Sequence, residues 1–302
     1  MKAPRLAAAL FAPLLVVTAC GDDDEGAVVE TGGAEAALAR LEAAPDAVAE
    51  AGSARMEMTM TIAVMGETVD ITAEGGFDGT QAVITMDLGA ALGGFAQETG
   101  ESLPPGFDEP MTIVVDGTTT YLKVPMLAAL TGTDGWLSVS AEDMGVAGDT
   151  LGLGVGPSGN PAQLVESLRG VSDEIEELGS AEVRGVDTTR YRVLVDLEKA
   201  AAELPADARE AYEQQVAGLG ATTLPLEVWV GDDGLVYRMA MDFADLVGQV
   251  EGDELEGLES GSMVLELFDY GADVEVEVPD PSEVTPFSEV MGGFGGDPGA
   301  LG

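Results

Sequence analysis

Apolar and polar residues alternate along much of the chain, beginning at Ser53. In 56–64 every even position is apolar and most odd positions are polar, which is the period of a long strand with one dry face. The alternation returns in 69–74 and, after the turn at Gly79, in 82–88. Three such stretches joined by short turns predict an antiparallel meander.

The same period predicts further strands in 111–139, which complete a first run that begins at Ser53, and in 175–268, which form a second run, for about ten strands in total. In the second run, 175–178 and 181–184 are predicted as separate strands. Tight turns are expected at Asp116-Gly117, at Gly185 and at Asp232-Asp233-Gly234.

Helices are predicted at three places. Residues 34–51 repeat apolar side chains every three or four positions, as one helix or as two turns divided at Pro45. Residues 162–168 follow a good helix start, and 197–219 read as a helix broken near Pro205. The fold class expected is α+β: a large curved antiparallel half-barrel sheet with helices packed on its concave face.

Glycine is concentrated in two long stretches, Gly89 to Pro110 and Gly145 to Gly159, which are candidate gates. Residues 280–302 are rich in glycine and proline and are expected to be a disordered tail. The folded domain is therefore assigned to residues 34–279.

The first twenty residues resemble the signal of a bacterial lipoprotein. Lys2 and Arg5 precede the apolar run 7–17, which is too short to span a bilayer, and small residues lead to Cys20. Residues 1–19 would be the signal peptide, Cys20 the lipidated residue, and 20–33 an acidic flexible tether. The alternative is a plain signal peptide that ends near a cysteine, but Cys20 is the one cysteine of the chain.

Charge and composition narrow the function. The formal net charge of −44 argues against a nucleic-acid partner, because such a surface repels phosphate. The chain has no histidine, which removes the commonest general base and metal ligand. Neither Asp22-Asp23-Asp24 nor Asp232-Asp233-Gly234 continues with calcium-loop spacing. A carboxylate-pair hydrolase stays open, but no pair stands out, so we expect no enzyme, no cofactor and no metal.

Several motifs together resemble the actinobacterial LppX/LprG lipoproteins and, more distantly, the LolA-like lipoprotein carriers. The likeness covers roughly 34–279, and its motifs mark turns and strand ends: Val114-Val115-Asp116-Gly117, Tyr121-Leu122-Lys123-Val124-Pro125, Gly135-Trp136, Val183 to Tyr191, and Leu224 to Val230 before Gly234-Leu235-Val236. The resemblance implies a half-barrel with an apolar cavity that carries acylated lipids or lipoproteins in the cell envelope. This chain differs in its acidity and in its two glycine-rich stretches.

The strand faces supply the candidate site. Methionine is flexible and polarizable, so a methionine stripe suits a surface that fits variable apolar ligands, although it equally suits an ordinary core. The candidate cavity-lining residues are Met56, Met58, Met60, Ile62, Val69, Ile71, Ala82, Ile84, Met86 and Leu88. Tyr121, Trp136 and Trp229 are interpreted as packing or rim aromatics.

Two functions compete. The first is a lipoprotein, anchored on the extracytoplasmic face of the cell membrane, that binds an acylated lipid or lipoprotein in an apolar cavity for transport. The second is an envelope sensor or protein-interaction module with a filled core, a protein partner and no lipid cargo.

Overall fold

The computed structural model describes residues 31–64, 66–89, 93, 105–106, 109–131, 135–139, 175–197, 199, 201, 209, 222–242 and 258–294. The chain divides into two units, Met1–Thr31 and Gly32–Gly302, and every described residue after Thr31 belongs to the second. The predicted signal peptide, Cys20, most of the tether, the second glycine-rich stretch and the helix at 162–168 lie outside the described residues, as does most of the helix at 197–219.

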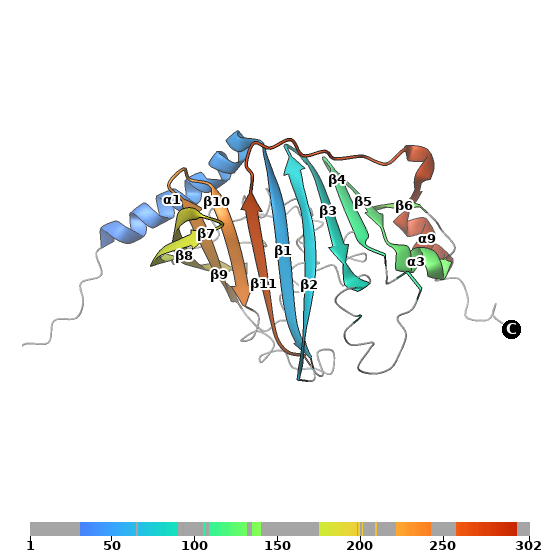
Figure 1. Ribbon diagram of the computed structural model, residues 1–302, viewed down its shortest axis with the longest axis horizontal. Coiled ribbons are helices and arrows are strands. Elements are labelled where there is room, and N and C mark those ends of the chain that lie inside the picture. The colour runs from blue at the N-terminus through green and yellow to red at the C-terminus, as the bar shows by residue number, and fades with distance from the viewer. Residues whose placement is uncertain are drawn as a thin grey trace, which may run out of the picture. The chain divides into compact units, whose positions relative to one another are not determined.

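Twelve strands of the described chain form one open, curved, mostly antiparallel sheet (Figure 1). Their order is β12-β6-β5-β4-β3-β2-β1-β11-β10-β9-β8-β7. The strands are β1 (Ser53–Val64), β2 (Glu67–Asp78), β3 (Gln81–Asp87), β4 (Met111–Asp116), β5 (Thr119–Lys123), β6 (Trp136–Val139), β7 (Ile175–Val183), β8 (Val186–Asp196), β9 (Thr223–Gly231), β10 (Val236–Asp242), β11 (Leu258–Phe268) and β12 (Val284–Pro286).

Two meanders meet in the middle of this sheet. The first runs from β1 outward to β6, and the second runs from β7 back to β11, which pairs with β1. Arg55 lies opposite Phe268, and the antiparallel register continues to a bulge at Ala63 and Val64. The two runs of strands predicted from the sequence are confirmed.

One face of the sheet, here called the apolar face, carries the even positions of β1 and the residues directly opposite them on the other strands. Met58 lies opposite Ala73 of β2 and Leu265 of β11, and Ala73 lies opposite Met86 of β3. All four are buried. Directly opposed residues share a face, so the alternation of separate strands builds a continuous apolar surface. Other buried members are Met56, Phe77, Ile84, Ile113, Leu122, Val139, Tyr191, Val193, Val228, Val230, Met239 and Leu267.

A long helix lies beside the turn that joins β9 and β10. Helix α1 (Thr31–Ala51) is continuous through Pro45, which decides for one helix between the two alternatives, and it begins three residues earlier than predicted, inside the expected tether. Arg40 pairs with Asp232 of the β9–β10 turn at 3.6 Å. The buried residues of α1 share one stripe and belong to the same core cluster as the apolar face: Ala37, Leu41, Ala44 and Val48.

At the edge of the second meander the structure has one strand, β7, where the sequence predicted two. The sequence predicted strands at 175–178 and 181–184, whereas β7 runs unbroken from Ile175 to Val183 with a bulge between Glu177 and Gly179. Gly179 has a φ of +102°, which only glycine adopts readily. Gly179, which lies between the two predicted strands, is therefore next to a bulge within one strand.

The prediction of a disordered C-terminal tail is wrong for residues 281–294. Residues 281–294 were expected in a disordered tail, but they form a 3-10 turn (η2, Pro281–Glu283), strand β12 and helix α9 (Phe287–Phe294). β12 pairs with β6 in parallel, at the far edge of the first meander. Phe287 is 1% exposed and belongs to the core cluster, which gives this segment an apolar anchor that its glycine-rich composition conceals.

The opposite face of the sheet carries a row of charged and aromatic side chains. Arg190, Trp229, Arg238, Glu266 and Glu57 lie directly opposite one another on β8, β9, β10, β11 and β1. Both arginine guanidinium groups lie over the Trp229 ring, at 5.1 and 5.4 Å from its centre, and Arg238 pairs with Glu266.

Two like charges stand side by side in this row, and a third residue compensates them. Glu266 and Glu57 are directly opposed, an arrangement that is unfavourable for like charges. Arg184, in the β7–β8 turn, donates to Glu266 at 2.6 Å and to Glu57 at 2.9 Å and stacks on Phe268 at 4.0 Å. Arg184 and Gly185 both have positive φ, as a two-residue hairpin turn of this hand requires.

The Glu266 network makes folding stability depend on pH. Partial burial disfavours the charged form of Glu266, but hydrogen bonds from Arg238 and Arg184 outweigh it and hold its pKa below the ordinary value of 4.5. A depressed folded-state pKa contributes stability above the unfolded-state pKa, and that stability is lost as pH falls through the folded-state pKa. We expect Glu266→Gln to lower the free energy of unfolding by about 1–3 kcal/mol at neutral pH.

This loss should shrink as pH falls below about 4.5, which urea titrations at a series of pH values measure. Glu182→Gln, on the exposed edge strand β7, is the matched control and should change stability little at any pH. An equal, pH-independent loss in both variants would contradict the assignment.

The anchoring role of α9 is tested by Phe287→Ala. Removing this buried ring should lower the free energy of unfolding by about 3–5 kcal/mol in a chemical denaturation experiment. Glu289→Ala, on the exposed side of the same helix, should stay within about 0.5 kcal/mol of the parent. If the two variants were equally stable, the C-terminal segment would not be part of the folded domain.

Candidate functional site

The ten residues predicted to line a cavity all lie on the apolar face. They come from β1, β2 and β3, with Leu88 just past the end of β3. Met60 lies opposite Ile71, Ile62 opposite Val69, and Ala82 opposite Phe77. The alternation therefore brings the predicted set together on one surface.

Burial divides the set into two groups along the strands. Met56, Met58, Ala82, Ile84 and Met86 are at most 7% exposed and belong to the core cluster. The remaining residues are half-buried: Met60, Ile62, Val69, Ile71 and Leu88. The half-buried group surrounds the β1–β2 turn and the C-terminal end of β3. This is the part of the apolar face with room for contact beyond the protein's own core.

Two adjacent glycines of β2 lie beside the buried group. A Cβ atom on Gly75 would lie 1.9 Å from the carbonyl oxygen of Val83, and one on Gly76 would lie 2.7 Å from that of Ala54. The neighbouring backbones thus fill the space that a side chain would need, and such a close approach is one reason for glycine within a strand. Met56 and Ile84 lie opposite Gly75 on the two neighbouring strands.

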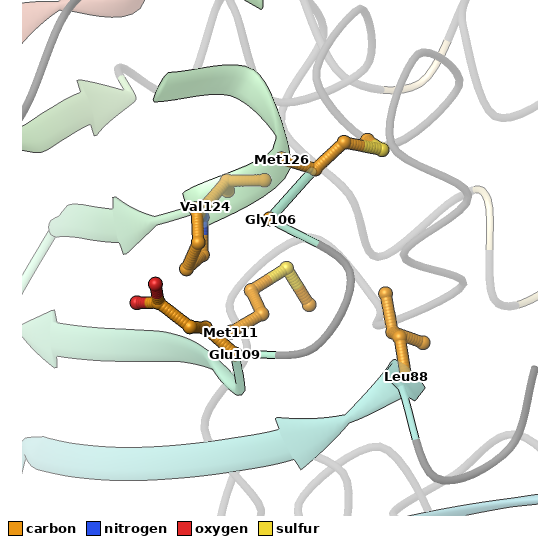
Figure 2. Close-up of a pocket in the computed structure, with 7 residues that line it drawn as sticks. Leu88, Gly106, Glu109, Met111, Val124 and Met126 are labelled. Atoms are coloured by element: carbon orange, nitrogen blue, oxygen red, sulfur yellow. The ribbon is translucent and has the colours of Figure 1, made fainter. Parts of the chain in front are cut away.

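A small pocket opens where β3 and β4 meet the start of helix α3 (Pro125–Thr131), as Figure 2 shows. Its volume of about 20 Å³ has room for little more than one water molecule. Its lining surface is apolar and is formed by Leu88, Gly106, Glu109, Met111, Val124, Pro125 and Met126, and the Glu109 carboxylate points away from Met111 and Met126 in Figure 2.

Leu88 is the one pocket residue that the sequence prediction included. The others come from three separate segments, and alternation marks Met111 and Val124 only as members of their own hairpin. The signal that could have found the pocket is the pairing of β3 with β4, which sets Met86 opposite Met111 and continues the methionine stripe across a third pair of strands.

The acidic turn at Asp232-Asp233 is structural, as predicted. Asp233 accepts hydrogen bonds from the Leu235 backbone N–H at 3.1 Å and from the Tyr237 hydroxyl at 2.7 Å. Burial, followed by this hydrogen bond, raises the pKa of Tyr237 to about 12. Among the described residues, no group of three or more cysteine or acidic side chains is placed to hold a metal ion.

The predicted packing role of the aromatic residues agrees with their burial. Trp229 is 7% exposed on the face opposite the candidate site, between its two arginines. Tyr121 and Trp136 are half-buried. No helix within the described ranges is both long and apolar enough to cross a membrane.

Comparison with known proteins found relatives by sequence and by structure. No family model matches the chain. An uncharacterized 31.2 kDa protein of Streptomyces griseus, from the rplA-rplJ intergenic region, is 31% identical over 183 residues, which cover 58% of this chain and 55% of that protein. The chain thus matches about half the length of this curated relative.

The solved structures found include two proteins from mycobacteria. Lipoprotein LppX of Mycobacterium tuberculosis is 15% identical with a TM-score of 0.44, covering 80% of this chain and 99% of that one. LprF of Mycobacterium bovis is 15% identical with a TM-score of 0.39, covering 81% and 97%. A LolA-superfamily protein of Nitrosomonas europaea is 10% identical with a TM-score of 0.29, covering 82% and 97%.

Two of these names, LppX and the LolA superfamily, also occur in the sequence resemblance. The TM-scores are below 0.5, so the fold and the site of this chain rest on its own strand order, register and burial.

Proposed function

We propose that this chain is an envelope lipoprotein that binds the acyl chains of a lipid or lipoprotein. In this proposal Cys20 carries the lipid anchor on the extracytoplasmic side of the cell membrane, and helices cover the concave side of a half-barrel. The observation that carries it is the continuous apolar face, whose half-buried end combines methionine with branched aliphatic side chains.

The energetics of acyl binding suit such a face. Each methylene removed from water contributes about 0.8 kcal/mol, so a decyl chain gains about 8 kcal/mol before the cost of ordering it. Methionine side chains adjust to different chain lengths at low cost. Binding and release of this kind need no catalytic residue, only an apolar surface that opens and closes.

The site is tested with two neighbouring residues of β1 that point to opposite faces. Met60 is half-buried on the apolar face, opposite Ile71 and Met263, whereas Thr59 lies on the other face, opposite Thr72 and Val264. Met60→Asp should reduce the acyl lipid that co-purifies with the chain by about tenfold or more, because a carboxylate on that surface must be desolvated by the bound tail. Native mass spectrometry of the full chain measures the bound lipid.

Thr59→Asp is the matched control, since it adds the same charge at the same depth of the sheet on the other face. Both variants are first checked for a cooperative unfolding transition. Equal lipid content in the parent and Met60→Asp would contradict binding at this face. A parent that carries no lipid and takes up none when it is supplied would favour the sensor alternative, with a filled core and a protein partner.

The anchor is tested separately at Cys20. We expect the parent chain, expressed in a bacterial host fed an alkyne-bearing fatty acid, to become labelled and to remain with the membrane fraction. Cys20→Ser should lose both the label and the membrane association, because the thiol is the acceptor. Unchanged labelling of Cys20→Ser would contradict the lipobox assignment.

A further inference from the structure

The segment between β11 and η2 is extended but pairs with no strand. In Figure 1 residues 272–280, here called the strap, run past the ends of β1–β4 on their way from β11 to β12. Within the described part of the chain, the backbone of residues 273–279 makes no hydrogen bond. Positions 274, 276 and 278 are all valine, which strongly prefers strands. The strap therefore has a strand sequence whose backbone donors and acceptors lack a partner strand there.

Both ends of the strap are held by the sheet. The Gly271 N–H donates to the Ser53 carbonyl oxygen at 2.9 Å, and the Ser53 hydroxyl donates to the Ala272 carbonyl oxygen at 2.6 Å. At the other end, β12 pairs with β6. Between the two, Val274 packs on β2, where a Cβ on Gly76 would lie 3.1 Å from the Val274 Cγ1 atom. An incoming strand thus meets a preordered edge, which lowers the entropic cost of binding.

Carboxylates occupy the outward positions of the strap. Val274 and Val276 are half-buried, whereas Asp273, Glu275 and Glu277 are exposed. Among the residues that the structure describes, none of these three forms an ion pair. Alternate residues of a strand are about 7 Å apart, so the three carboxylates form a regular row along the strap.

The strap is better suited to an added strand than the two outermost strands of the sheet. β7 is interrupted by the bulge beside Gly179, and β12 is three residues long and ends at Pro286, which has no N–H. In the strap, no residue from 272 to 280 has a positive φ, so its extended backbone is uninterrupted up to Pro279.

The row of carboxylates determines which strand fits. Like charges that face each other across a strand pair are unfavourable, which argues against a second copy of the strap as the partner. Opposite charges in the same arrangement are favourable, and lysine or arginine at alternate positions would bring a cation opposite each carboxylate. We propose that the strap binds an extended basic segment of another protein by taking it up as an added strand. Gly76, under the strap, lies opposite Arg55 on the face away from the candidate site, so this interaction is independent of the proposed acyl binding.

The test uses a short acetylated and amidated peptide in which lysine alternates with valine. Fluorescence anisotropy of the labelled peptide, titrated with the full chain at a fixed, moderate salt concentration, measures its affinity. Glu275→Gln combined with Glu277→Gln should weaken binding about tenfold, since an exposed ion pair contributes up to about fivefold in affinity. Glu182→Gln combined with Asp187→Asn removes two exposed carboxylates from the β7–β8 hairpin, and this matched control should change the affinity less than about twofold.

Backbone N–H groups separate strand addition from charge attraction alone. Two further peptides keep the sequence and charge but are N-methylated, one at its lysines and the other at its valines, so each lacks the N–H groups of one edge. A strand that pairs through one edge should lose about tenfold or more in affinity in one of these two forms. The unmethylated peptide at saturation should also slow amide hydrogen exchange within 273–278 about tenfold or more and leave exchange in β7 unchanged.

Several outcomes would overturn the proposal. They are a parent chain that does not bind the lysine–valine peptide, an equal loss of affinity in the two double variants, full affinity in both N-methylated peptides, and unchanged exchange of the strap amides. Strap protection that rises with protein concentration without peptide would identify a second copy as the occupant, and would also overturn it. None of these results bears on the acyl-binding test at Met60, which measures lipid content and not peptide affinity.

Discussion

The pairing of β1 with β11 is the interaction on which the rest of this structure depends. These long strands join two meanders that are otherwise separate along the chain, and their register decides which side chains share a face. A shift of one residue would turn Met56, Met58 and Met60 away from Leu265 and Leu267 and toward the charged face. On that face Arg238 pairs with Glu266 across β10 and β11, and Arg184 links Glu266 of β11 to Glu57 of β1, which favours the same register.

Sequence patterns predicted the strands whose position and apolar side follow from the alternation of neighbouring residues. Strict alternation in 56–64 and 82–88 located strands and assigned their apolar sides correctly. The interpretation failed where long-range contacts determine structure. Val284 to Pro286 is too short to read as a strand and forms one because β6 offers it an unpaired edge. Gly179 lies between two stretches that were predicted as separate strands, and only the pairing of β7 with β8 shows one strand with a bulge there.

The residues of the candidate site could likewise be grouped from the sequence only where they are close together along the chain. Residues on one hairpin could be grouped from sequence, since Met60 and Ile71 are brought together by a turn a few residues away. The pocket residues could not, because Leu88, Gly106 and Met126 meet only after β3, β4 and β5 have paired.

The position of the last strands has a consequence for how the chain reaches its native state. During synthesis the first meander emerges with two unpaired edges, β1 and β6, and both are covered only by strands within residues 258–286. Unpaired edges are templates for association between chains. The protein therefore passes through a long interval in which half of its sheet is complete and aggregation-prone, and loss of the C-terminal segment would make that interval permanent.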